Sequence, residues 1–156
     1  MRLLRVDKVF PEARVFGLSK QERDCLLAIV EYYPFLELYI QPLSKTGAVN
    51  PENQRLLEES MTEQRHSRLR KLYEFLRGNP QIERDESGSF RLTLKAEEVE
   101  WLLQVLNEIR VGCWIRLGRP DTDDLAKRKL NAADLRARTT MDLCGYFQVE
   151  LMEASK

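Results

Sequence analysis

The segment from Leu92 to Gly118 constrains the fold of this chain more than any other part of its sequence. Apolar residues recur within it at spacings of three and four, which form one wide stripe on a helix: Val99, Leu102, Leu103, Leu106, Ile109, Cys113 and Leu117. Gly118 and Pro120 indicate the helix end, because glycine accepts a left-handed conformation and proline cannot continue the hydrogen-bond ladder. Thr93 is expected to cap the start. We therefore predict a strand that leads directly into a long, mostly buried helix.

Further helices are predicted from their end signals, over about 20–33, 51–77 and 132–153. Residues 19–22 read Ser-Lys-Gln-Glu, which fits a capping box in which the serine and the glutamate each satisfy an amide of the first turn. Asn50 with Pro51 is a favoured helix start, and Asn131 or Thr122 is expected to begin a further helix. Gly145 is expected to allow close contact between helices, although glycine weakens the helix that contains it.

Two segments favour β-structure. Residues 1–18 are predicted to form a short strand or an extended segment, and residues 81–94 alternate apolar and polar residues around a turn at 85–88, which is typical of a hairpin. The sequence thus predicts one domain over residues 1–156. Its expected fold is mainly α, with about four helices packed around a central helix and one or two short β-hairpins.

The central segment resembles a known family. Leu106-Asn107-Glu108-Ile109-Arg110, followed by Arg116-Leu117-Gly118, is similar to the core motif of DUF2017, a bacterial domain of unknown function. Asp142, Gln148 and Leu151 match the spacing of that family's last helix, and the acidic linker with Asp121, Asp123 and Asp124 is also similar. The family has no established activity. Its actinobacterial members are often encoded beside the adaptor of the Clp protease, and some are labelled as regulators, so the resemblance implies a regulatory role in protein quality control.

Several polar residues interrupt or border the apolar stripes. Buried polar groups need partners, so we predict that these residues contribute to one polar cluster between the helices: Arg65, Asn107, Arg110, Asp142 and Gln148. Arg116, near the end of the central helix, is a further candidate for contact with a partner. Two interpretations are open, namely that the cluster flanks the core and is structural, or that it forms a recognition face.

The most basic segment of the chain supports a different interpretation. It contains Arg65, Arg68, Arg70 and Lys71 on a predicted helix, where they form either a solvated face or a contact with nucleic acid. Lys+Arg 25 against Asp+Glu 25 gives no net charge, which argues against a general nucleic-acid coat but leaves a local patch open. The segment also lacks the interleaved aromatic residues that stack on bases.

The remaining features of the sequence argue against several kinds of site and protein. Three cysteines without a Cys-x-x-Cys pair favour buried free thiols over disulfides or a zinc site, and nothing calls for a metal or another cofactor. No apolar run is long enough for a bilayer span, and the start has no hydrophobic signal core, so a soluble cytoplasmic protein without membrane contact is expected. With one histidine and no nucleophile motif, the chain lacks the residues on which hydrolytic enzymes usually depend, and we favour a protein that is not an enzyme.

The leading hypothesis is therefore a non-enzymatic protein-interaction or regulatory module. Its expected partner is another protein, including a second copy of the chain in a homodimer. The first alternative is a nucleic-acid-binding transcriptional regulator that uses the face from Arg65 to Lys71. The second alternative is a small-molecule binder or enzyme with a polar pocket near Arg110.

Overall fold

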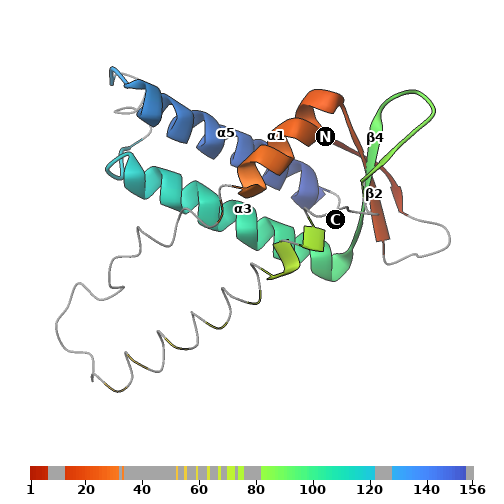
Figure 1. Cartoon of the computed structure of the whole chain (residues 1–156), viewed down its shortest axis with the longest axis horizontal. Helices are drawn as coiled ribbons and strands as arrows, with labels where there is room; N and C mark the ends of the chain where they lie inside the picture. The colour runs from red at the N-terminus through yellow and green to blue at the C-terminus, as the bar shows by residue number, and fades with distance from the viewer. Residues whose placement is uncertain are drawn as a thin grey trace.

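The computed structural model describes residues 1–6, 13–31, 33, 52, 55, 59, 63, 67, 70–72, 74–75, 82–121 and 128–153. They form a mainly helical fold with a small antiparallel sheet, which confirms the predicted class. Figure 1 shows the two long helices, α3 (Ala96–Arg116) and α5 (Ala132–Glu153), side by side with the sheet at one end. The shorter helix α1 (Lys20–Glu31) packs against both. The described residues at isolated positions between 52 and 75 are helical.

The sheet joins two parts of the chain that are far apart in sequence. Its strands are β1 (Arg2–Val6), β2 (Ala13–Leu18), β3 (Ile82–Arg84) and β4 (Phe90–Lys95), in the order β1-β2-β4-β3 with every neighbouring pair antiparallel. In the pairing of β2 with β4, Phe16 lies opposite Leu92. Both side chains are fully buried, so the register brings large apolar groups together on one face of the sheet.

Helix α3 starts later than its sequence predicts. Thr93 belongs to β4 and does not cap the helix, because the pairing with β2 continues to Lys95 opposite Ala13. The helix begins at Ala96, and the Glu98 carboxylate accepts a hydrogen bond from the Lys95 amide at 2.7 Å. The long-range ladder therefore overrides the local capping signal and makes the junction between strand and helix direct.

The end of α3 follows the sequence prediction. Gly118 adopts a positive φ of 85°, and its amide donates to the carbonyl of Ile115 at 3.0 Å. The Arg119 amide donates to the carbonyl of Trp114 at 3.0 Å, which completes a Schellman motif. The two bonds satisfy carbonyl groups that the last helical turn leaves open.

The starts of the other two helices are also confirmed. The Ser19 amide donates to Glu22 Oε2 at 2.8 Å while the Glu22 amide donates to Ser19 Oγ at 3.2 Å, which is the predicted capping box. Asn131 Oδ1 accepts from the Asp134 amide at 2.9 Å and so caps α5. The Tyr146 hydroxyl donates to Glu22 Oε1 at 2.6 Å, which links α5 to the first turn of α1.

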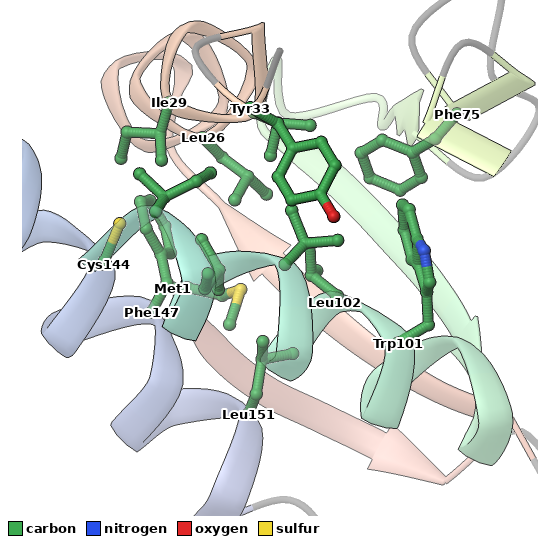
Figure 2. Packing of buried hydrophobic residues seen from close by; sticks show 14 of the residues in the cluster. Met1, Leu26, Ile29, Tyr33, Phe75, Trp101, Leu102, Cys144, Phe147 and Leu151 are labelled. Carbon is green, nitrogen blue, oxygen red and sulfur yellow. The ribbon is translucent and has the colours of Figure 1, made fainter. Parts of the chain in front are cut away.

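One hydrophobic core connects α1, α3, α5 and the sheet. Figure 2 shows side chains from α1, α3 and α5 meeting in it, among them Leu26, Leu102 and Phe147, none of which is more than 1% exposed. The predicted stripe of α3 faces this core, except that Leu103 is only half-buried. Burying one leucine or phenylalanine side chain stabilises a fold by roughly 1.5–3 kcal/mol, so this stripe holds the helix in place.

Within the residues that the structure describes, every helix is too short or too polar to span a membrane.

Two glycines, Gly118 just after the end of α3 and Gly145 inside α5, provide a matched test of this fold. Gly118→Ala should lower the free energy of unfolding by about 1–2 kcal/mol, because a Cβ disfavours the left-handed conformation. Gly145→Ala should raise it by about 0.5–1 kcal/mol, because Gly145 lies inside α5 with no atom within 4 Å of an added Cβ. Chemical denaturation of both variants measures the two values. Effects of the same sign would contradict this account.

Candidate functional site

A groove lies on the outer side of the contact between α3 and α5. It has a volume of about 580 Å³, and its walls are Arg110, Val111 and Trp114 from α3 and Met141, Asp142 and Gly145 from α5. Arg110 and Trp114 are four residues apart on α3, as are Met141 and Gly145 on α5, so each helix presents about one turn to the groove. The two helices are antiparallel, since Gln148 donates to the Leu103 carbonyl, while Arg110, later on α3, and Met141, earlier on α5, line the same groove.

The groove has opposite charges on its two walls. Arg110 on α3 and Asp142 on α5 are both exposed, and they lie on the same side of the molecule. Within the described part of the chain, Arg110 has no hydrogen bond and no ion pair. Asp142 has an ion pair with Arg138, but the distance between Arg138 Nε and Asp142 Oδ2 is 3.9 Å, so this contact is weak. Both charges are therefore available to a binding partner.

The apolar part of the groove is exposed as well. Val111 is 41% and Trp114 is 39% exposed, although each is large and apolar. The Trp114 indole donates from Nε1 to the Pro120 carbonyl at 3.0 Å, and this bond fixes the ring at the edge of the groove. Large apolar side chains that are held in solvent on a groove are typical of binding surfaces.

Gly145 contributes open space to the groove. The expectation that it permits close contact between helices is wrong for this chain, because no atom lies within 4 Å of the place that a Cβ would occupy. A glycine inside a helix costs roughly 0.8–1 kcal/mol relative to alanine. Among the described residues, no contact within the chain requires this glycine.

The other predicted residues of the polar cluster lie elsewhere. Asn107 and Arg116 are exposed on α3 and do not line the groove. Gln148 is 9% exposed; its Nε2 donates to the Leu103 carbonyl at 3.5 Å, and its Oε1 has no partner among the described residues. Arg65 lies outside the described residues. The structure thus brings Arg110 and Asp142 together, whereas a cluster that includes the other members stays a prediction.

The predicted basic face can be located only in part. Arg70 and Lys71 are helical and exposed, while Arg65 and Arg68 lie outside the described residues. A nucleic-acid contact at this face stays a prediction.

Four of the six groove residues were not among the candidate site residues, namely Val111, Trp114, Met141 and Gly145. Periodicity alone does not separate a core stripe from a binding stripe. Two features of the sequence could have indicated the groove. Trp114 lies one turn after Arg110, and Gly145 lies in the middle of a predicted helix.

Two cysteines lie in the core beneath this surface. All three thiols were predicted to be buried. This is confirmed for Cys113, which is 7% exposed, and for Cys144, which is fully buried, whereas Cys25 is only half-buried. Burial raises the pKa of Cys113, and burial together with neighbouring Cys113 raises the pKa of Cys144 to about 12. Such thiols stay protonated near neutral pH and are poor nucleophiles. Among the described residues, no group of three or more His, Cys, Asp or Glu side chains is arranged to hold a metal ion.

Comparison with known families identifies the chain. The family model of DUF2017, a domain of unknown function, matches residues 44–155. The chain belongs to the DUF2017 family. This confirms the resemblance and extends it upstream of the central motif, and it places all six groove residues inside the DUF2017 region. Strands β1 and β2 and helix α1 precede that region. A search of curated proteins and a search of solved structures each found no match to the chain.

The pKa of Cys144 predicts how the stability of this DUF2017 chain depends on pH. An ordinary thiol titrates near 9.0 and the folded Cys144 thiol at about 12, so the unfolded state binds fewer protons between these values. The free energy of unfolding should therefore fall as the pH rises through this window, with a contribution of up to about 1.4 kcal/mol per pH unit, and should be unaffected by this thiol below it.

Urea unfolding of the wild type and of Cys144→Ala, at pH values on either side of 9.0, measures this contribution. The wild type should lose stability more steeply above that pH, since the variant lacks the thiol. Parallel pH profiles for the two proteins would show that the folded thiol is not shielded from water.

Proposed function

We propose that this DUF2017 chain is a non-enzymatic protein-interaction module whose binding surface is the groove between α3 and α5. The observation that carries the proposal is the combination of exposed apolar side chains and unfilled space in one groove. Val111 and Trp114 line it together with Gly145, and no described residue of another element comes within 4 Å of a Cβ added there. In protein interfaces, such surfaces are covered by the partner.

The residue types in the groove favour a protein as the partner. Tryptophan and arginine are enriched among the residues that dominate binding energy at protein interfaces, and the groove has one of each, Trp114 and Arg110. Because the hydrogen bond to Pro120 already orients Trp114, its ring loses little freedom when a partner packs on it.

The same lining argues against catalysis in the groove. Its ionisable side chains are Arg110 and Asp142. Arginine does not release a proton near neutral pH, so this lining offers one carboxylate without a second group to act as its acid or base. Binding, rather than proton transfer, is the chemistry that this set of side chains supports.

A small-molecule site is the second candidate, because a groove of about 580 Å³ beside Arg110 falls within the usual size range of ligand pockets. Small-molecule sites enclose most of the ligand surface, whereas four of the six lining residues here are exposed. The exposed lining therefore favours a protein.

The proposal predicts that filling the groove abolishes partner binding without damage to the fold. Gly145→Leu adds an apolar side chain to the groove, and leucine is a better helix former than glycine, so α5 should persist. Tagged full-length protein would be incubated with lysate of its source organism, and bound proteins quantified by mass spectrometry. Partners of the wild type should fall about tenfold or more in the variant.

Ala133→Leu is the matched control, because it adds the same side chain to an exposed position of α5 that does not line the groove. It should retain the partners of the wild type. Equal recovery with both variants would exclude the groove as the binding surface. Circular dichroism and denaturant unfolding establish that both variants are folded.

A further inference from the structure

The charges of the groove point to a particular kind of partner. A ligand that is only an anion is attracted by Arg110 but repelled by Asp142. A ligand that is only a cation is attracted by Asp142 but repelled by Arg110. The groove therefore favours a partner that presents one positive and one negative group at matching positions. The chain itself has such a surface.

We infer that the groove is occupied by a second copy of this chain, related to the first by a two-fold axis. The inference rests on the proposed function, since it names the partner of that same groove. In a two-fold interface, if residue i of one copy meets residue j of the other, then j of the first also meets i of the second. Arg110 of each copy therefore pairs with Asp142 of the other, so the same ion pair forms twice in the dimer.

The apolar part of the groove suits the same arrangement. A two-fold axis that brings Arg110 of each copy to Asp142 of the other also covers the exposed Val111 and Trp114 of both copies, because these side chains lie within one turn of Arg110 on α3. At Gly145 no described side chain meets the place of a Cβ, so a partner can approach α5 closely there.

The apolar surface continues beyond the groove along α5. Val149 and Met152 follow Gly145 at spacings of four and three, so they lie on the same face of the helix, and they are 50% and 49% exposed. A stable interface covers about 800 Å² on each partner, which is more than one groove provides. This continuation supplies further apolar area on the same face. The zero net charge of the chain also removes long-range repulsion between copies.

Charge reversal distinguishes a second copy from any other partner. Arg110→Glu places two carboxylates together in each Arg110–Asp142 pair, and Asp142→Arg places two guanidinium groups together. Each single variant should dimerise about tenfold or more weakly than the wild type, because attraction becomes repulsion at two symmetric places. An equimolar mixture of the two variants should restore dimers, because both pairs are then of opposite charge.

Sedimentation of the full-length protein over a range of micromolar concentrations measures these dissociation constants. Lys20→Glu, an exposed reversal on α1 that does not line the groove, should dimerise like the wild type. A monomeric wild type at all concentrations would overturn the inference, as would single variants that dimerise normally or a mixture that stays monomeric.

The two proposals fail in different ways. If the wild type is monomeric and Gly145→Leu still loses a protein captured from the lysate, the second copy is excluded, while the groove remains a protein-binding surface. If the wild type is monomeric and Gly145→Leu loses nothing, both proposals are excluded. Dimers that Gly145→Leu and the single charge variants weaken, and that the mixture restores, support both.

Discussion

The fold depends on the antiparallel packing of α3 against α5. Both helices bury large apolar side chains in the common core, Leu106 from α3 and Phe147 from α5, each no more than 1% exposed. The sheet fixes one end of α3, because β4 passes into the helix without a loop, and the Schellman motif at Gly118 fixes the other. The two helices are thereby held over their whole contact, and the outer side of that contact becomes a surface of defined shape.

Local physics made much of this architecture predictable. The capping residues Ser19 and Asn131 and the stop at Gly118 act within one helical turn, so they can be identified without knowledge of the rest of the chain. The failure at Thr93 has the opposite cause. Its neighbours pair with β2, which lies nearly eighty positions earlier in the chain, and a ladder between such distant segments is not visible in a local pattern. The union of both β-segments in one sheet was unpredictable for the same reason.

The groove could not be predicted from the sequence, because a surface between two helices depends on how they pack. Arg110 was a candidate because it interrupts an apolar stripe, and Asp142 because it lies inside the last helix, but their approach depends on how the two helices pack. Asn107 and Gln148 were selected by the same rule, yet one is exposed and the other is buried, with no partner for its Oε1 among the described residues. A polar residue within an apolar stripe can be found from the sequence. Whether it lies on the surface or in the core depends on how the helices pack.

Gly145 and Trp114 together give the strongest argument that the groove has been shaped by binding. A chain that optimised only its own stability would place a helix-forming residue at 145, where a Cβ meets nothing within 4 Å, and would not leave Trp114 39% exposed. Departures from local stability are expected where function requires them. Here both departures occur in one groove, beside an arginine with no ion pair among the described residues. One partner that packs on Trp114, fills the space over Gly145 and pairs with Arg110 accounts for all three features.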